Sequence, residues 1–258
     1  MSKDLTRRQF LGTACKALTA GVLIPSAGLT VLSQSSTAET TSQPTSWDKV
    51  WEGKEWGFVV DTEKCIGCGS CVKACKKENH VPEDHEVYRT WVERYVETDR
   101  GEVQIDSPKG GQEFPPLGES DAKQFFVPKL CNQCHNAPCT QVCPVGATYK
   151  TGDGVILVDQ KRCVGCRYCI QACPYGARFL HPETKVVDKC NWCYHRVQKG
   201  MRPACATVCP VGARKFGNLK DPESEVSKII EKERIRTLKP EHGTKPFVYY
   251  IGLDEVVV

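Results

Sequence analysis

The sequence lacks any apolar run long enough to cross a membrane. Its mildly apolar stretch, residues 17–32, is interrupted by Gly21, Pro25 and Gly28 and is shorter than the roughly 20 residues that a helical span needs. A surplus of positive charge is also lacking. The formal net charge is +4, and four basic residues and one acidic residue lie in the first sixteen positions, so the rest of the chain is near +1. Nucleic acid is therefore excluded as a partner, because no basic face remains to bind it.

A recognisable catalytic constellation is missing as well. No nucleophile with a neighbouring base and no substrate-binding motif stands out in the sequence. We therefore expect a protein that has no catalytic residues and is not an enzyme by itself.

Cysteine is present in abundance, with 17 residues of which only Cys15 lies outside four groups of four. Groups 1 to 4 are, in order, Cys65, Cys68, Cys71, Cys75; Cys131, Cys134, Cys139, Cys143; Cys163, Cys166, Cys169, Cys173; and Cys190, Cys193, Cys205, Cys209. Group 3 with Pro174 is a C-x2-C-x2-C-x3-C-P run, in which three thiolates hold one 4Fe–4S cluster and the fourth ligates another. The spacing predicts four 4Fe–4S clusters with all sixteen cysteines as iron ligands.

Two other uses of cysteine stay open as alternatives. Zinc also binds C-x2-C pairs, and an exported protein rich in cysteine can be a disulfide scaffold. The run in group 3 is seldom a zinc site, and four regular groups suit iron–sulfur cubanes better than disulfides. A non-redox zinc or disulfide scaffold is thus the less favoured hypothesis.

The same local pattern recurs at the cysteine groups: a short strand, a turn, a cysteine loop and a helical turn. Groups 2, 3 and 4 each continue into Pro-x-Gly-Ala, whereas Lys76 follows group 1 and predicts a helix that continues toward Glu78. The expected strands are 56–60, 125–127, 155–158, 186–187 and 247–251, with a hairpin over 86–105 and a helix that starts at 221–223. In that hairpin, Trp91, Glu93, Tyr95 and Glu97 are expected to share one face.

Groups 2 and 3 together span about fifty residues, the size of a two-cluster ferredoxin. The inner module then shares ligands crosswise, as Cys131, Cys134, Cys139 with Cys173, and Cys163, Cys166, Cys169 with Cys143. Groups 1 and 4 pair across it, as Cys65, Cys68, Cys71 with Cys209, and Cys190, Cys193, Cys205 with Cys75. Pairing of adjacent groups, 1 with 2 and 3 with 4, is the alternative. The predicted fold class is α+β, with two interleaved two-cluster ferredoxin-like modules, short strands, a hairpin insertion and a C-terminal helix and strand.

The N-terminus resembles a twin-arginine export signal. Residues 6–11 read Thr-Arg-Arg-Gln-Phe-Leu, the apolar stretch follows, and Ser36-Thr37-Ala38 offers a small-x-small cleavage site. An exposed arginine pair before a core helix is the alternative. The expected organisation is a signal peptide (1–38), a linker or arm (39–55), the first half of the outer module with the hairpin insertion (56–128), the inner module (129–182), and the second half of the outer module with a C-terminal extension (183–258). The expected location is the periplasm, with membrane association through a partner subunit.

Several basic residues lie near cysteines in the sequence and are candidates to stabilise reduced clusters, namely Lys64, Arg162, Arg167, Lys189 and Arg214. The long gap of group 4 carries His195, Arg196, Lys199 and Arg202, which are candidates to tune a cluster or to contact a partner. A solvated charge is the alternative for each of them.

From Trp56 onward the sequence resembles the sixteen-cysteine, four-cluster subunits of the complex iron–sulfur molybdoenzymes, most of all those of the tetrathionate reductase type. The resemblance lies in segments 129–139, 161–166, 172–175, 203–205, 238–244 and 250–254. It implies a relay that passes single electrons between a molybdopterin-dependent catalytic subunit, of the tetrathionate, polysulfide or thiosulfate type, and a membrane subunit that handles quinone or quinol. A cytochrome c is a further candidate partner. The alternative keeps the clusters without a molybdoenzyme, as an iron–sulfur linker in a respiratory membrane complex of the sulfite- or nitrite-reduction type.

Overall fold

The computed structural model describes residues 53–116 and 121–257. The expected export signal and most of the expected arm lie outside these residues. The described elements belong to one compact unit, Pro44–Val258. Among the described residues, no helix combines the length and the apolarity that a membrane span requires.

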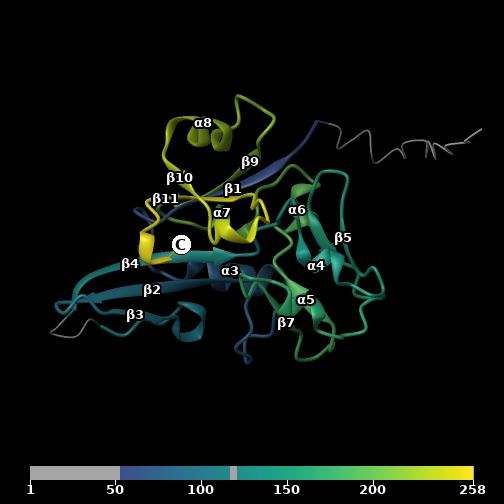
Figure 1. The fold of residues 1–258 in the computed structure, drawn as a ribbon, viewed down its shortest axis with the longest axis horizontal. Helices are drawn as coiled ribbons and strands as arrows, with labels where there is room; N and C mark the ends of the chain where they lie inside the picture. Colours follow the sequence, from purple (N-terminus) through teal and green to yellow (C-terminus); the bar gives the residue numbers. More distant parts are fainter. Residues whose placement is uncertain (1–52, 117–120, 258) are drawn as a thin grey trace, which may run out of the picture. The chain divides into compact units, whose positions relative to one another are not determined.

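A four-stranded sheet joins the two ends of the described chain, in the order β10-β11-β1-β9 (Figure 1). Its strands are β1 (Trp56–Asp61), β9 (Arg214–Asn218), β10 (Ile235–Arg236) and β11 (Val248–Ile251). β1 runs parallel to β11 and antiparallel to β9. The strands expected at 56–60 and 247–251 are confirmed. The pairing of β1 with β9 places group 1 close to the end of group 4.

The hairpin insertion forms a separate three-stranded sheet in the order β3-β2-β4. Its strands are β2 (Thr90–Thr98), β3 (Val103–Asp106) and β4 (Asp121–Leu130). The expected hairpin is confirmed, and Trp91 and Tyr95 both donate hydrogen bonds to the Glu93 carboxylate, at 2.8 and 2.9 Å, which confirms that these three share a face. β4 is longer than the expected 125–127 because it pairs with β2 along its length, up to Leu130 opposite Thr90. It therefore leads directly to Cys131.

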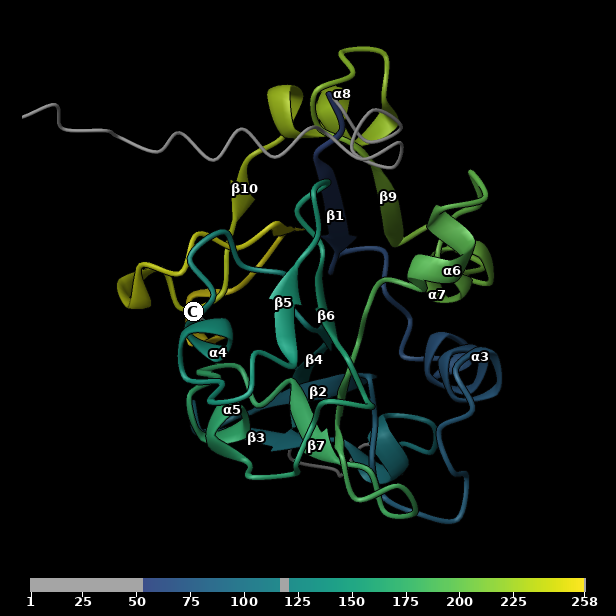
Figure 2. The ribbon, with the colours of Figure 1, turned by 90° about the vertical axis from the view of Figure 1, so that its right-hand side faces the viewer.

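Two short antiparallel ladders and several helices complete the repeat (Figure 2). The ladders are β5 (Thr148–Lys150) with β6 (Ile156–Val158) and β7 (Arg178–Leu180) with β8 (Val187–Lys189). The α-helices are α3 (Ser70–Glu78), α4 (Pro138–Gln141), α5 (Tyr168–Gln171), α6 (Tyr194–Val197), α7 (Ala204–Thr207) and α8 (Glu225–Lys232). The 3-10 turns are η1 (Pro108–Gly110), η2 (Pro240–His242) and η3 (Glu255–Val257). The helix expected to continue past Cys75 is confirmed as α3.

The start of the C-terminal helix differs from the prediction. α8 begins at Glu225 with Ser224 as N-cap, and not at residues 221–223. The Asp221 carboxylate accepts a hydrogen bond from the Glu223 N–H at 2.9 Å and so forms a turn before the helix. Ile235, which follows the helix, belongs to β10. α8 covers β9 (Figure 1) and buries Val226 completely.

The main core combines aromatic side chains with cysteines. Trp192 is 2% exposed, and its ring lies 5.5 Å from that of Phe216 and 6.3 Å from that of Phe58. Cys71, Cys131, Cys190 and Cys205 belong to the same cluster of buried side chains. Because thiols occupy so much of this interior, the fold has a small apolar core of its own and depends on what the thiols bind.

Candidate iron–sulfur sites

All sixteen cysteines of groups 1 to 4 are free thiols, so the described residues contain no disulfide among them. A zinc site would need four ligands within about 2.3 Å of one point. Among residues 53–116 and 121–257, no three His, Cys, Asp or Glu side chains converge on a single ion position. The described cysteines are therefore arranged neither as a disulfide scaffold nor around one ion.

The first three cysteines of group 1 lie with the last cysteine of group 4. Cys65, Cys68, Cys71 and Cys209 line one small cavity and are here called quartet A. The contact arises because β1, which precedes group 1, pairs with β9, which follows group 4. Arg214, at the start of β9, lines the same cavity.

The remaining cysteine of group 1 lies with the rest of group 4. Cys75, Cys190, Cys193 and Cys205 are all buried and are here called quartet B. The side-chain amide of Asn79 joins two of them, with Nδ2 3.6 Å from both Cys75 Sγ and Cys193 Sγ. α3 and α7, which carry Cys75 and Cys205, contact each other.

Asn79 is itself held by a buried ion pair. Arg89 donates to Asn79 Oδ1 at 2.8 Å and binds the Asp188 carboxylate through Nε and Nη2, both at 2.9 Å. Such a two-pronged pair fixes the orientation of the guanidinium. The hairpin insertion thereby positions a hydrogen-bond donor at quartet B.

Groups 2 and 3 form the two other quartets. Cys131, Cys139 and Cys173 all raise the pKa of Cys134, and these four are here called quartet C. The helical turns α4 and α5, which lead to Cys143 and Cys173, contact each other (Figure 2). The crosswise set predicted for the remaining cluster is Cys143 with Cys163, Cys166 and Cys169, here called quartet D.

The quartets follow one another in a row. α3 carries both Cys71 of quartet A and Cys75 of quartet B. Gln133, which lies between Cys131 and Cys134 of quartet C, donates to the carbonyl oxygen of Cys190 of quartet B at 2.9 Å. Cys134 and Cys139 of quartet C share a buried cluster with Cys169 of quartet D. The order is therefore A, B, C, D.

Exposure differs between the ends and the middle of this row. Cys68 of quartet A and Cys166 of quartet D are exposed, whereas the cysteines of quartet B are all buried and those of quartet C are buried apart from Cys173, which is intermediate. Large apolar side chains are exposed at the same ends. Ile66 is 57% exposed beside quartet A, and Val164 is 64% exposed beside quartet D.

The thiols fit a strongly cationic group. Burial, together with neighbouring thiolates, raises the pKa of Cys65 to about 11 and that of Cys134 to about 12. For Cys75 burial, together with Cys190, Cys205 and Cys193, raises the pKa well above its usual value. Four thiolates so close together require compensating positive charge, which the iron atoms of a cluster supply.

Backbone N–H groups also point at the sulfurs. Val187 N–H donates to Cys163 Sγ at 3.4 Å, and Thr148 N–H donates to Cys143 Sγ at 3.5 Å. Burial raises the pKa of Cys143, but N–H groups of Thr148, Val145 and Ala147 outweigh it and the pKa ends below its usual value. Donors to sulfur stabilise anionic cluster ligands and raise reduction potentials.

The Pro-x-Gly-Ala segments form one repeated turn. Gly146, Gly176 and Gly212 have φ of 61°, 63° and 62°, a left-handed conformation that favours glycine. The backbone conformation is therefore a sufficient reason for glycine at these three positions. The alanine that follows each glycine is buried, which fixes the start of the next strand.

The structure separates the basic residues that lie beside cysteines in the sequence. The side chains of Lys64 and Arg162 are 61% and 69% exposed and pair with Asp61 and Asp159. Arg167 is exposed as well, so none of the three is enclosed with the cysteines. Lys189 and Arg214 are buried. Arg178, which was not among the sequence-based candidates, is also buried, and its position directly after Pro-x-Gly-Ala, like that of Arg214, was the available signal.

The long gap of group 4 has two kinds of basic residue. His195 and Arg196 contact the Glu78 carboxylate at 2.7 and 2.9 Å, and so tie α6 to the end of α3. Lys199 and Arg202 are exposed.

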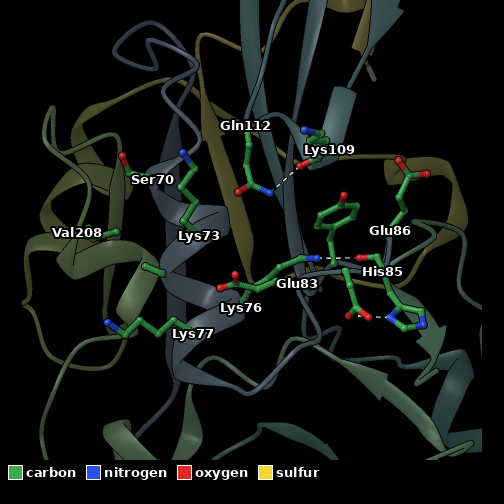
Figure 3. A pocket seen from close by; sticks show the side chains of 13 residues that line it. Ser70, Lys73, Lys76, Lys77, Glu83, His85, Glu86, Lys109, Gln112 and Val208 are labelled. Atoms are coloured by element: carbon green, nitrogen blue, oxygen red, sulfur yellow. Dashed lines mark hydrogen bonds and ion pairs between the residues drawn. The ribbon is translucent and has the colours of Figure 1, made fainter. Parts of the chain in front are cut away.

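A surface hollow of about 720 Å³ lies beside α3 (Figure 3). Lys76, which stands where the other groups have proline, is one of the residues that line this hollow. Its ammonium donates to the carbonyls of Pro82 and His85 at 2.9 and 2.8 Å and lies 4.4 Å from the centre of the Tyr88 ring. This lysine holds the segment after α3 against the helix.

The fold and the four quartets define a ferredoxin-like carrier of four 4Fe–4S clusters. Residues 122–219 match a family model described as a 4Fe–4S dicluster domain, and residues 56–77 match a 4Fe–4S binding domain. A subunit of the tetrathionate reductase of Salmonella typhimurium is 43% identical over 205 residues, which cover 79% of this sequence and 74% of that protein.

Two further relatives have similar coverage. A component of the polysulfide reductase of Wolinella succinogenes is 38% identical over 199 residues, covering 77% of this sequence and 94% of the relative. Protein NrfC of Escherichia coli is 41% identical over 201 residues, covering 77% and 81%. The protein belongs to the family of iron–sulfur subunits that includes these components of tetrathionate and polysulfide reductases. It is an electron-transfer subunit and not a catalytic enzyme by itself.

Proposed function

We propose that the protein passes single electrons along the row of quartets between a membrane subunit that handles quinone or quinol and a periplasmic molybdopterin-dependent catalytic subunit. A 4Fe–4S cluster supplies one-electron chemistry when it is bound by four thiolates. The difference in exposure carries the proposal: the two ends of the row are accessible and the two central quartets are enclosed. A protein of this design exchanges electrons at its ends and shields them in between.

The quartets define the ligands that we propose. Each cluster takes three cysteines from one group and one from another, so the inner ferredoxin-like module, 129–182, lies within an outer module formed by 56–128 and 183–258. The cavity shared by Cys65, Cys68, Cys71 and Cys209 supports this crosswise arrangement. Adjacent pairing of groups would require Cys75 to ligate with group 2, whereas Cys75 lies beside Cys190, Cys193 and Cys205.

Serine substitutions test the proposed ligand sets. The variants Cys75→Ser and Cys205→Ser each remove one ligand of quartet B, so each single variant and the double variant should keep about twelve of about sixteen iron atoms. The double variant Cys71→Ser with Cys75→Ser touches quartets A and B and should keep about eight. Iron and acid-labile sulfide per protein molecule, measured on anaerobically purified protein, give the result. Equal iron content in the two double variants would contradict the crosswise sets.

The names of the relatives support a catalytic partner. Three of them are named as parts of larger reductases, which act on tetrathionate, polysulfide and selenate. We propose that this protein is likewise the electron-transfer component of a molybdopterin-dependent reductase. The twin-arginine motif in residues 6–11 supports export of the folded, cluster-loaded protein to the periplasm.

The exposed apolar residues at the ends are the proposed contacts to partners. Ile66→Glu should release the partner at quartet A and Val164→Glu the partner at quartet D, because each places a charge in an apolar interface. The measurement is purification of the tagged protein from its native membranes, with molybdenum and the membrane subunit quantified. Val256→Glu is the control, since Val256 is 52% exposed on η3. Equal retention of both partners in all three variants would refute these contacts.

A second candidate function is a linker without a molybdoenzyme. The similarity to protein NrfC, at 41% identity, favours keeping it. The same purification separates the two functions: molybdenum in the complex supports the first, and c-type cytochrome without molybdenum supports the second.

A further inference from the structure

Three basic side chains are buried between the quartets. Arg178, Lys189 and Arg214 are 4%, 2% and 1% exposed. In the part of the chain that the structure describes, none of the three forms an ion pair with a carboxylate. A buried cation without a counter-charge is strongly unfavourable. The arrangement therefore requires anionic groups nearby.

Arg214 lies between quartets A and B. It lines the cavity of quartet A. Arg214 is the first residue of β9, which contacts α7, the helix that carries Cys205 of quartet B. Cys71 and Cys205, one from each quartet, are among the groups that raise the pKa of Arg214 against the effect of burial. Its Nη2 donates to Thr90 Oγ1 at 3.0 Å, whereas its buried Nη1 has no hydrogen-bond partner in the described residues. An orphaned guanidinium nitrogen at this place fits the net negative charge that a cluster and its four thiolate ligands carry together.

Arg178 occupies the equivalent place between quartets C and D. Its Nη2 donates to Cys139 Sγ of quartet C at 2.9 Å, and its Nη1 donates to Thr148 Oγ1 at 3.2 Å. Cys169 of quartet D is among the thiolates that hold its pKa above the usual value against the effect of burial. Arg178 and Arg214 both follow Pro-x-Gly-Ala directly, so the internal repeat places an arginine at two different junctions.

Lys189 lies between quartets B and C. Its ammonium donates to the carbonyl oxygens of Cys190, at 2.9 Å, and Ile156. Burial lowers the pKa of Lys189, and the thiolates of Cys131, Cys190 and Cys139 act against that effect. These three cysteines come from both quartets. Burial in β8 keeps this side chain away from solvent, unlike Lys64 at the same position before group 1.

We propose that Arg214, Lys189 and Arg178 are shared counter-charges, one at each junction of the row, and that each raises the reduction potentials of the two clusters beside it. Reduction of a cluster adds one electron and one negative charge without forming a bond. A cation between two clusters stabilises the reduced form of both and screens their mutual repulsion. Without these charges, an electron on one cluster would disfavour reduction of the next cluster through electrostatic repulsion. This inference rests on the proposed ligand sets.

Charge-removing variants test the proposal on the isolated full-length protein. The variants are Arg214→Gln, Lys189→Gln and Arg178→Gln, and the measurement is an anaerobic redox titration with dithionite and mediators, followed by electron paramagnetic resonance. Each variant should lower two of the four midpoint potentials by about 59 mV, which corresponds to a change of about tenfold in the one-electron reduction equilibrium. Lys64→Gln and Arg162→Gln are matched controls, because these exposed residues directly precede Cys65 and Cys163 as Lys189 precedes Cys190.

The pattern of shifts decides the outcome. Arg214→Gln and Lys189→Gln should share one shifted cluster, as should Lys189→Gln and Arg178→Gln, whereas Arg214→Gln and Arg178→Gln should share none. The charge-retaining variants Arg214→Lys, Lys189→Arg and Arg178→Lys should restore the potentials. Unchanged potentials, a uniform shift of all four, or equal shifts in the exposed controls would overturn the proposal.

Loss of clusters is also informative. If a charge-removing variant loads less iron and its charge-retaining counterpart loads about sixteen atoms per protein molecule, the counter-charge role is supported. Equal iron loss in both variants of a pair would show that packing, and not charge, is needed, and would overturn it. These potentials are measured without partner subunits, so failure to find a molybdenum-containing partner would refute the proposed function and leave this inference intact.

Discussion

Two glycines of the hairpin region show how a single position is constrained. Gly101 and Gly111 have φ of 77° and 85°, so both occupy the left-handed region. A Cβ at Gly101 would have no neighbour within 4 Å, whereas one at Gly111 would collide with the carbonyl oxygen and side chain of Val92. Backbone strain alone acts at the first position, and strain with a steric clash acts at the second.

We predict that Gly111→Ala destabilises the protein far more than Gly101→Ala. Strain at Gly101 should cost about 1 kcal/mol, a fall of about 2–4 °C in the melting temperature of a protein of this size. The clash at Gly111 should cost about 3 kcal/mol or more, because β2 must move. Anaerobic melting at a fixed scan rate, followed by visible absorbance of the clusters, measures both. Similar melting temperatures for the two variants would show that Val92 can move aside at little cost in stability.

At the scale of elements, α3 depends on a side chain that the other groups lack. Proline follows groups 2, 3 and 4 and ends a short helical turn, whereas Lys76 allows α3 to reach Glu78. The helix then offers Lys76 to the loop beyond it and Glu78 to α6. The lysine in place of proline therefore connects three segments.

We predict that Lys76→Met loosens the loop after α3. The variant removes two hydrogen bonds from a buried ammonium to backbone carbonyls, worth about 2 kcal/mol together, and should lower the melting temperature by about 4–8 °C. Limited proteolysis should cut within residues 82–88 faster than in the unmodified protein. Lys77→Met is the control, since Lys77 is the exposed neighbour on the same helix. Equal protease resistance of the two variants would argue against the tether.

At the scale of the whole molecule, the row of quartets has open ends and a closed middle. Cys68 and Cys166 are exposed, and the cysteines of quartet B are all buried. A reagent in solution therefore reaches quartets A and D before it reaches B and C.

We predict that an iron chelator removes iron from the anaerobically reduced protein in two phases. About half of the sixteen iron atoms should leave first, from the clusters of quartets A and D. Absorbance of the ferrous chelate gives the rates, and electron paramagnetic resonance shows which signals disappear. A single phase that includes all the iron would mean that the central clusters are as accessible as the outer ones.

The repeat, the hairpin and the strands at both ends were predictable, because each depends on neighbours in the sequence. Cysteine spacing, the Gly turn at Gly101 and alternating β-branched residues are local signals. The start of α8 was misplaced because Asp221 and Ser224 both resemble N-caps, and only the packing of Val226 against β9 selects the later one. Arg178 was missed although it follows Pro-x-Gly-Ala as Arg214 does, because that position shows the repeat and only the packing around it shows that the side chain is buried.

Cysteine spacing by itself determined the kind of cofactor and the number of sites, since a loop with two-residue gaps must present its sulfurs together whatever surrounds it. Only the tertiary structure decided which cysteines meet and which cations are enclosed with them. Those relations join segments more than a hundred residues apart, such as β1 and β9. Burial depends on everything packed around a side chain, so Lys64 and Lys189, alike in sequence, differ in solvent exposure and in charge environment.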